Sequence, residues 1–241
     1  RRPPRSTQSR SSAASDVYKR QLLERHNIDY TTVYSDGDTI DSPLIISLKG
    51  RAHDILATER LLLNILSHLS GISTLTHNIV KIAKEANPNV EILATRKTLP
   101  GLRDMEKEAV VHGGGQTHRM RLDDAILIKD NHLKLSKSIR ESISLSRIKY
   151  PDLMLEVEAD NEEQALEIAE CGADRVMLDN FTPLDAAKTI KKLRQISNIE
   201  IEISGGVTIE NVAEYAKNTD FISLGSLTMS SLPVDFSLHV I

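Results

Sequence analysis

Charged side chains follow a series of short apolar segments in the later part of this sequence. Arginine and lysine can hold carboxylates and phosphates, while aspartate and glutamate can hold a divalent cation. A single charged segment end is typical of an ordinary solvated rim, but four in succession favour a functional site. The four charged ends are Thr95-Arg96-Lys97-Thr98, Lys129-Asp130, Glu156-Val157-Glu158 and Asp179-Asn180.

Glu158 and Asp179 are the candidate metal ligands. Glu156 and Glu158 are two residues apart and would share one face of a strand. Carboxylate oxygens are ligands that Mg²⁺ prefers, and a bound Mg²⁺ commonly bridges them to a substrate phosphate. The alternative is a structural network, in which Glu158 and Asp179 pair with Lys129 and Arg96.

Four cations are candidates for binding a polyanion, and arginine can hold a carboxylate through two parallel hydrogen bonds. The glycine triplet 113–115 stands shortly before one of them and predicts a mobile loop; the alternative is a flexible linker. Neighbouring acids nearly balance the local charge, so composition alone does not indicate a basic patch. The four cations are Arg96, Lys97, Arg119 and Lys129.

Two glycine-containing segments predict a phosphate site. Ser204-Gly205-Gly206 leads toward a helix expected near Thr208, and Gly225-Ser226 follows the last apolar segment. β/α barrels often build phosphate sites from the loops after their last strands and an adjacent helix N-terminus. Each segment alone is also typical of a tight turn with positive φ. Together, at corresponding strand ends, they favour a phosphorylated ligand.

Strands and helices are expected to alternate after Asn87-Pro88-Asn89, which predicts parallel strands joined by right-handed crossovers. A closed or nearly closed barrel competes with an open doubly wound sheet. No G-x-G-x-x-G or Walker A motif follows a strand, which counts against dinucleotide and P-loop folds. The expected strands are 91–95, 125–129, 153–158, 175–178, 200–203 and 221–224, and the expected helices are 103–112, 136–148, 162–171, 183–195 and 209–217.

The preceding part of the chain is expected to form a smaller, partial α/β domain. Two strands are predicted at 28–34 and 44–48, and a long helix at 51–86 with a break near Gly71. The apolar stripe of this helix is formed by Ile55, Leu62, Leu66 and Leu69.

Residues 1–21 differ from the remainder in composition. They hold six basic residues and one acid, Asp16, and they closely resemble a translated sequencing-library adapter. The last six of them, DVYKRQ, are the translation of GATGTGTATAAGAGACAG, which ends the adapters of transposon-based libraries. An organelle transit peptide is disfavoured because no helical face is apolar. We therefore expect residues 1–21 to be non-native and loosely placed, and the genuine chain to begin abruptly at Leu22, with its natural N-terminus missing.

Composition excludes several classes of protein. The 241 residues, 40% of them hydrophobic, suit one large domain or a barrel with a smaller partner. Trp is absent and aromatics are 3%, so base stacking with nucleic acid is not expected. Residues 22–241 carry 24 basic and 33 acidic residues, a net charge of −9 that also disfavours nucleic acid. No apolar run approaches the roughly 18 residues of a membrane helix. The single cysteine, Cys171, rules out an internal disulfide, and we expect it to pack at a helix end.

The sequence ATRKTLPGLRDMEKEAVVHGGGQTHRMRLDDAILIKDNH, at 94–132, closely resembles the quinolinate phosphoribosyltransferase family. The resemblance continues through ERLLLN (59–64), EVE (156–158), MLDN (177–180), SGG (204–206) and SLGSLT (223–228), and it covers essentially all of residues 22–241. It implies an N-terminal α/β sandwich at 22–88, truncated here, an incomplete β/α barrel at 89–228, and a C-terminal segment, 229–241, that returns to the N-terminal domain.

The resemblance also implies an activity. Members of the family transfer the phosphoribosyl group of phosphoribosyl pyrophosphate (PRPP) to quinolinate with decarboxylation, giving nicotinate mononucleotide, CO₂ and pyrophosphate. The implied cofactor is Mg²⁺, and the implied assembly is a cytoplasmic homodimer with a shared active site, or a higher oligomer.

Site residues follow from the same resemblance. Lys129, Glu158 and Asp179 would be catalytic, and the last two would also hold the ribose and the metal. Thr95, Arg96, Lys97, His118, Arg119 and Lys129 would bind quinolinate, with Arg60 reaching in from a second subunit. Ser204, Gly205, Gly206, Gly225, Ser226 and Leu227 would bind phosphate. Two positions depart from the family pattern: Thr117 stands where Asn is common, and Met229 where His is common.

Three alternatives stay open at this point. The nearest is the related molybdenum-cluster pyrophosphorylase-like protein, which a quinolinate assay would distinguish. The second is a Schiff-base aldolase that uses Lys129, since barrels of this kind often carry a lysine at a strand end. The third is a non-catalytic module that binds a phosphorylated ligand without turnover.

Overall fold

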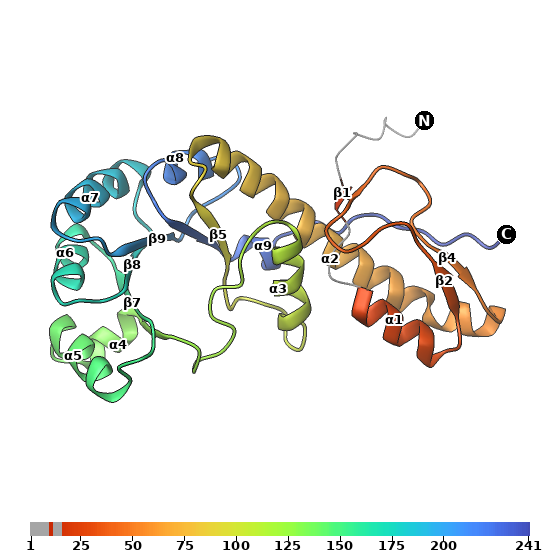
Figure 1. The fold of residues 1–241 in the computed structure, drawn as a ribbon, viewed down its shortest axis with the longest axis horizontal. Coiled ribbons are helices and arrows are strands. Elements are labelled where there is room, and N and C mark those ends of the chain that lie inside the picture. The colour runs from red at the N-terminus through yellow and green to blue at the C-terminus, as the bar shows by residue number, and fades with distance from the viewer. Residues whose placement is uncertain (1–9, 12–15) are drawn as a thin grey trace. The chain divides into compact units, whose positions relative to one another are not determined.

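The computed structural model describes residues 10–11 and 16–241, and these form two compact units that are each discontinuous in sequence (Figure 1). The first unit contains the described residues up to Asn78, together with Lys97–Gly115 and Ser226–Ile241. The second contains Ile79–Arg96 and Gln116–Gly225.

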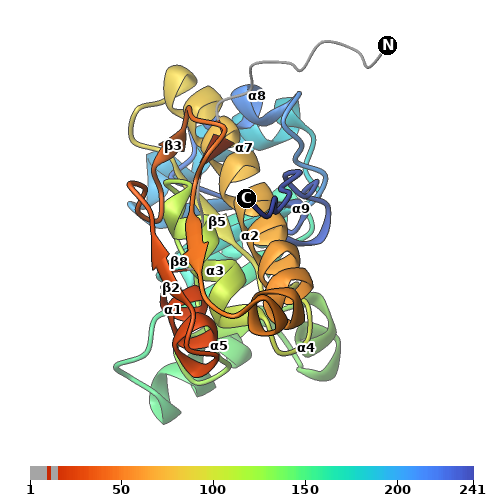
Figure 2. The ribbon, with the colours of Figure 1, turned by 90° about the vertical axis from the view of Figure 1, so that its right-hand side faces the viewer.

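The first unit packs helices against short antiparallel strands. Its elements are β1 (Arg10–Ser11), α1 (Asp16–Arg25), β2 (Asp29–Thr31), β3 (Thr39–Ile40), β4 (Ser47–Lys49), the first part of α2 (Ala52–Ala86), α3 (Arg103–His112) and α9 (Ser226–Met229). β2 pairs with β4 and β1 with β3, and Figure 2 shows α1 beside β2. Leu23, Ile28, Leu62 and Leu66 form the buried core of this unit, and Phe236 packs against them. The apolar stripe of α2 therefore faces the core, as its spacing predicts.

The expectation that residues 1–21 lie outside the fold is wrong for the part that the structure describes. Arg10-Ser11 pairs with β3, and residues 16–21 form the first turns of α1. The side chain of Lys19 is buried, and its ammonium lies 5.6 Å from the centre of the Tyr30 ring. A long lysine stem can cover apolar surface while its charge meets an aromatic face. Residues 1–9 and 12–15 lie outside the described part of the chain.

The predicted break near Gly71 is also absent, because α2 continues through it. A Cβ atom at Gly71 would lie 2.3 Å from the carbonyl oxygen of Leu232. The amide of Val234 also donates to the carbonyl of Ser67 at 2.9 Å. This glycine therefore allows the C-terminal segment to approach the helix, and it does not interrupt the helix.

The second unit is built on a six-stranded parallel sheet in the order β5-β10-β9-β8-β7-β6. This is the cyclic order of a barrel, left open between β5 and β6. All six strands predicted from the sequence are present, and the barrel is incomplete, as expected. The strands are β5 (Glu91–Ala94), β6 (Ile126–Ile128), β7 (Leu155–Ala159), β8 (Arg175–Asp179), β9 (Glu200–Ser204) and β10 (Phe221–Leu224).

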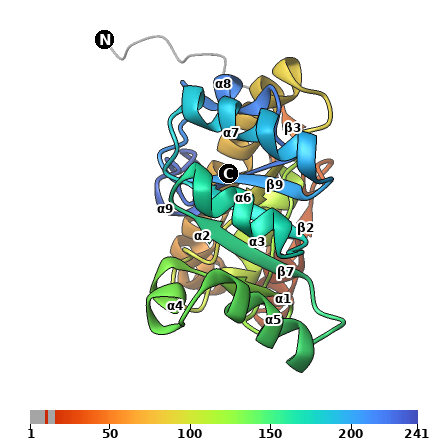
Figure 3. The same ribbon diagram turned by 90° about the vertical axis from the view of Figure 1, so that its left-hand side faces the viewer.

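Helices cover the outer face of this sheet, and Figure 3 shows α5, α6 and α7 in succession along it. They are α5 (Ile139–Lys149), α6 (Glu162–Glu170), α7 (Pro183–Ile196) and α8 (Val212–Ala216), whereas the short α4 (Asp130–Leu135) follows β6 and has no buried residue. The α4 helix is absent from the expected elements, and α8 is shorter than the predicted 209–217. Cys171 caps the C-terminal end of α6, as expected.

In β7 (LEVEA) and β9 (EIEIS), apolar residues on the outer face alternate with glutamates on the inner face. Val157, Leu178 and Ile203 are fully buried on the outer face, where they pack toward the helices. Glu156 and Glu202 are equally buried but belong to the opposite face. The barrel interior therefore holds charged side chains, which must neutralise one another or a ligand.

The open edge of β5 is partly filled by the chain segment that begins at Gln116. The amide of Gln116 donates to the carbonyl of Ile92, and the amide of Ala94 donates to that of Gln116, both at 2.8 Å. This pairing places residues 116–119 along the seam of the barrel. The glycine triplet before it is not the mobile loop that was expected, because the amides of Gly114 and Gly115 donate to carbonyls of α3.

Candidate active site

Three carboxylates converge at the carboxyl ends of β7 and β8. Glu158, Asp160 and Asp179 each offer an oxygen, and these oxygens all lie within 4.8 Å of one another. Glu158 is buried, whereas Asp160 is exposed. The sequence analysis missed Asp160, although the period of two that relates Glu156 to Glu158 also reaches it.

Lys129 faces this carboxylate group from the end of β6. Its Nζ lies 2.5 Å from Glu158 Oε2, with the lysine side chain 46% exposed. The main-chain amide of Lys129 donates to His132 Nδ1 at 2.9 Å, where α4 begins. The KDNH sequence thus orients Lys129 through its own main chain. The Lys129–Glu158 ion pair, which was expected if these residues formed a structural network, is present.

Two arginines lie close together beside the seam. Thr95 and Arg96 follow β5 directly and are half-buried, like Arg119. Burial lowers the pKa of Arg119, and the positive charge of Arg96 lowers it further, while Glu156 and Asp124 act in the opposite direction. Arg119 also donates from Nη1 to the carbonyl of Ala125 at 3.3 Å. These two partly buried guanidinium groups repel each other, and a bound anion would relieve that repulsion.

His118 points into the barrel and not toward bulk water. Its Nε2 lies 3.0 Å from Glu156 Oε2 and 3.3 Å from Glu202 Oε2. Burial lowers the pKa of His118, but the two carboxylates raise it, and the net pKa is about 9. The amide of Arg119 donates to His118 Nδ1 at 2.7 Å. Because this nitrogen can accept only when it carries no proton, the hydrogen bond opposes the raised pKa and favours the tautomer with its proton on Nε2.

The two glutamates beside His118 are held in different charge environments. Burial and the negative charge of Glu202 raise the pKa of Glu156 to about 7. The pKa of Glu202 is raised by burial but lowered more by His118, Ser223 and Glu156 together, so it lies below its ordinary value. Arg175 Nη1 also lies 3.3 Å from Glu202 Oε2. The sequence analysis singled out neither Glu202 nor Arg175, although the alternation in EIEIS could have indicated the first.

The predicted phosphate loop follows β9. The carbonyl of Ser204 accepts a hydrogen bond from the main-chain amide of Asn180. Gly205 and Gly206 both have positive φ, at 81° and 66°. A Cβ atom at Gly205 would lie 2.2 Å from Asn180 Oδ1. The side chain of Asn211 closes the loop by donating to the carbonyl of Gly206. A compact turn thus stands where the glycines predict it, and Gly225 directly follows the next strand, β10.

Four of the predicted site residues belong to the first unit. The carbonyl of Lys97 accepts from Thr228 Oγ1 at 2.5 Å, and Ser226 begins α9. The side chain of Leu227 is fully buried, so only its main chain is available to a ligand. Arg60 is exposed on α2 over 75% of its side chain, so it points away from the core of its own chain.

A buried pair that the sequence analysis missed holds the chain just after Lys97. Glu106 accepts from the amide of Leu99 at 3.1 Å, and its other oxygen lies 2.7 Å from His68 Nε2. Glu106 is fully buried, so its carboxylate is fixed by these contacts.

Among the described residues, no helix is both long enough and apolar enough to cross a membrane.

The open parallel barrel, with arginines, a lysine and clustered carboxylates at the carboxyl ends of its strands, defines an α/β-barrel enzyme for anionic substrates. Residues 72–239 match the model of the quinolinate phosphoribosyl transferase C-terminal domain, and residues 12–70 match that of the N-terminal domain. The chain therefore belongs to the quinolinate phosphoribosyl transferase family, which confirms the resemblance. The N-terminal match begins inside the segment that resembles an adapter.

Similar proteins agree with this assignment. The chain is 44% identical over 211 residues to a probable nicotinate-nucleotide pyrophosphorylase [carboxylating] of Archaeoglobus fulgidus, a match that covers 86% of this chain and 81% of the relative. It is 43% identical to the protein of the same name from Methanocaldococcus jannaschii, over 91% of this chain and 80% of the relative. The solved nicotinate-nucleotide pyrophosphorylase of Francisella tularensis is similar in fold, with a TM-score of 0.88 and 31% identity over 95% of this chain and 82% of that one.

Proposed function

We propose that this chain transfers the phosphoribosyl group of PRPP to quinolinate with decarboxylation, giving nicotinate mononucleotide, CO₂ and pyrophosphate for NAD biosynthesis in the cytoplasm. The observation that carries this proposal is the approach of Lys129 to the carboxylate group Glu158, Asp160 and Asp179, in the same unit as Arg96 and Arg119. A planar dicarboxylate would neutralise the two guanidinium groups, and arginine is suited to hold each carboxylate through two hydrogen bonds. The names of the similar proteins support the same reaction.

Glu158, Asp160 and Asp179 fit a magnesium ion. Their oxygens converge, and all three are hard ligands of the kind that Mg²⁺ selects. When bound there, the ion would supply positive charge to the pyrophosphate leaving group. Glu158 and Asp179 would also face the ribose, where their negative charge favours the positive charge that develops at C1 as the bond to pyrophosphate breaks.

Lys129 and the arginines account for the second half of the reaction. The pyridine nitrogen attacks ribose C1, and the ring nitrogen then carries positive charge. Loss of the neighbouring carboxylate as CO₂ leaves an electron pair on a ring carbon, which this nitrogen and the fixed cations stabilise. The carbon is then protonated, so no covalent enzyme intermediate is required.

The Ser204–Gly206 turn and Gly225–Leu227 are assigned to phosphate binding. Two successive residues with positive φ can turn backbone amides toward one side, which makes a concave anion site. Arg60 is assigned to a shared site in a homodimer, where it would reach the quinolinate of the second subunit from its exposed place on α2.

The test is a coupled assay for pyrophosphate and nicotinate mononucleotide, with quinolinate, PRPP and Mg²⁺. Formation of both products, dependent on Mg²⁺, is expected. Binding of PRPP without product would instead favour the non-catalytic module, and turnover only with another acceptor would favour the molybdenum-cluster paralogue. A Schiff-base aldolase is disfavoured because the nitrogen of Lys129 is engaged by Glu158.

A further inference from the structure

Both ring nitrogens of His118 are used inside the protein. Nδ1 accepts the main-chain amide of Arg119 at 2.7 Å, and Nε2 lies 3.0 Å and 3.3 Å from oxygens of Glu156 and Glu202. The imidazole is 10% exposed and the two carboxylates are 1% and 0% exposed. Nδ1 is thus occupied by a main-chain amide, and Nε2 faces two buried carboxylates at ion-pair distance, so His118 links Arg119 to Glu156 and Glu202.

Glu202 is the most firmly fixed member of this group. It lies in the middle of β9, in register with Met177 on one side and Phe221 on the other. Arg175 Nη1 lies 3.3 Å from its carboxylate, and the guanidinium of Arg175 stacks 3.8 Å from the centre of the Phe221 ring. Arg175 and the imidazole of His118 therefore approach the same oxygen, Glu202 Oε2, which links the two groups through one fully buried carboxylate.

The same group could be considered a metal site, because one nitrogen and two carboxylates lie within 4.8 Å of one another. The hydrogen bond at Nδ1 argues against this. A histidine that binds a metal through one nitrogen normally donates a proton from the other. Here the other nitrogen accepts, so Nε2 must carry the ring proton and cannot coordinate an ion.

The backbone at His118 shows why such a clamp is needed. Its φ is +50°, a conformation that costs a residue other than glycine free energy and persists when its surroundings impose it. The next residue is Arg119, whose main chain is held by His118 and whose guanidinium is held by Ala125. Fixing the imidazole therefore fixes the point from which the arginine side chain begins.

We propose that Glu202 is a positioning residue which, together with Glu156, clamps His118 and thereby directs Arg119 toward the carboxylates of the substrate. This inference rests on the proposed function, since it takes Arg119 to bind quinolinate. If the contact that positions Arg119 is lost, the binding of quinolinate to Arg119 should weaken, while the rest of the site is retained. The binding of PRPP is therefore expected to be unaffected.

The experiment compares Glu202→Gln with Glu200→Gln. Both glutamates are on the same face of β9 and both pair with Arg175, but Glu200 is exposed and only Glu202 approaches His118. The dissociation constant of quinolinate is measured by calorimetry without PRPP, so that no turnover occurs. We expect Glu202→Gln to weaken binding about tenfold, because the variant loses the negative charge that lies 3.3 Å from His118 Nε2. Glu200→Gln should stay within about twofold, and both variants should keep the wild-type KM for PRPP.

A second measurement tests the clamp on His118 independently of whether quinolinate is the substrate. Hydrogen exchange of the Arg119 amide reports the contact to His118 directly, whatever the substrate is. It should accelerate in Glu202→Gln and not in Glu200→Gln. If the wild type fails to bind quinolinate, the proposed function falls, and this exchange rate still decides the clamp.

Two outcomes would overturn the inference. One is wild-type quinolinate binding and wild-type amide exchange in Glu202→Gln, and the other is an equal loss in the two variants. Should Glu202→Gln fail to fold, Glu202→Asp retains the charge but draws it back from His118 by one methylene. Glu202→Asp is then expected to show a smaller loss of quinolinate binding and a smaller acceleration of Arg119 amide exchange. If neither change appears, the clamp is refuted.

Discussion

The residues assigned to substrate binding are held by contacts that leave their charged ends in the site. Lys129 is oriented through its main chain by His132, and Arg119 through its main chain by His118. Removal of either side chain beyond Cβ should leave these main-chain contacts in place. Single substitutions can therefore separate binding from folding.

We expect Lys129→Ala and Arg119→Ala each to reduce quinolinate turnover about ten- to a hundredfold. The reason is that a charge-assisted contact to a carboxylate is worth about 1.5–3 kcal/mol. Melting temperatures should stay within about 3 °C of wild type, since neither side chain belongs to the apolar core. Steady-state kinetics and thermal unfolding check this, and wild-type-like activity in either variant would refute the assigned role.

The phosphate loop allows an equally direct comparison between two glycines. Gly205 and Gly172 have the same φ of 81°, but a Cβ would meet Asn180 Oδ1 at 2.2 Å in the first and nothing within 4 Å in the second. Alanine should cost about 1 kcal/mol of strain at either position. Only Gly205→Ala should also raise the KM for PRPP, by about tenfold or more, because the loop must shift. Equal KM values in the two variants would remove this loop from the phosphate site.

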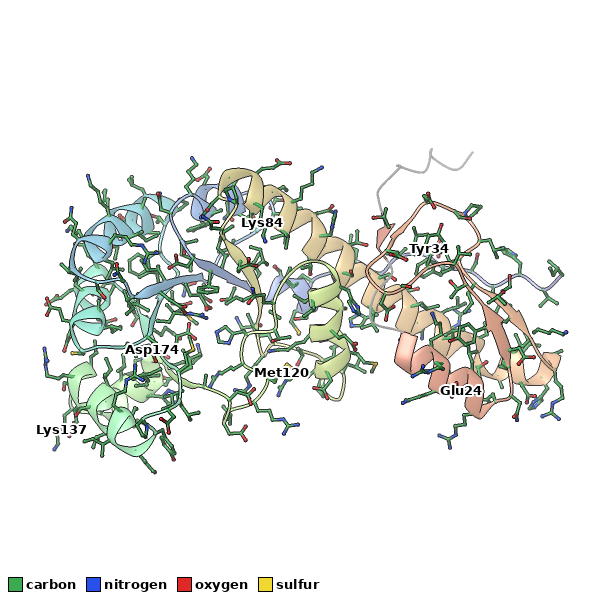
Figure 4. The ribbon with its side chains drawn as sticks, in the orientation of Figure 1. Glu24, Tyr34, Lys84, Met120, Lys137 and Asp174 are labelled. Carbon is green, nitrogen blue, oxygen red and sulfur yellow. The ribbon has the colours of Figure 1, made fainter. Side chains whose placement is uncertain are left out.

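At the scale of elements, the start of β7 is tied to the start of β8 by Asp174, which is labelled in Figure 4. Its carboxylate accepts the amide of Leu155 at 2.7 Å and pairs with Arg147 at 2.7 Å. Burial raises the pKa of Asp174, but the hydrogen bonds from Arg147 and Leu155 and the charge of Arg147 together lower it more, so the pKa lies below its ordinary 3.8. The contact therefore stabilises the ionised carboxyl group.

The sign of the pH dependence follows from this lowered pKa. The stabilisation is fully present above about pH 3.8 and is lost as the pH falls through the lower folded-state value. Asp174→Ala should therefore destabilise the protein at pH 7 by about 1 kcal/mol, a modest value because both partners are partly exposed. Urea unfolding at pH 7 and near pH 3 should show that the gap between wild type and variant narrows in acid. A gap that widens in acid would contradict the assignment.

At the scale of the whole molecule, the proposed homodimer makes a prediction about mixed subunits. Arg60→Ala and Lys129→Ala should each be nearly inactive if Arg60 completes the site of the partner. Random mixing produces heterodimers in which one of two sites keeps both residues, so about a quarter of wild-type activity should return. The activity of refolded or co-expressed mixtures, with the dimers quantified by mass, measures this. Heterodimers that regain nothing would rule out the shared site.

The strands of the second unit could be predicted from the sequence, as could the gathering of charged residues at one edge of its sheet. Short apolar segments that alternate with helical stretches predict all six strands of the sheet, because this pattern is typical of parallel strands joined by crossover helices. The carboxyl ends of parallel strands gather at one edge, so Lys129, Glu158 and Asp179 could be assigned to one site before any coordinates existed. The length of α2 and its apolar stripe also follow from local spacing.

Only the tertiary structure decided which distant residues meet. His118, Glu156 and Glu202 are far apart in the chain, and nothing in their local patterns predicts that the barrel seam brings them within hydrogen-bonding distance. Gly71 is typical of a helix break in sequence, yet it serves the approach of Leu232. Residues 16–21 have no apolar face, yet Lys19 is buried over Tyr30. In each case the deciding contact joins different segments of the chain, and local composition and periodicity carry no information about such contacts.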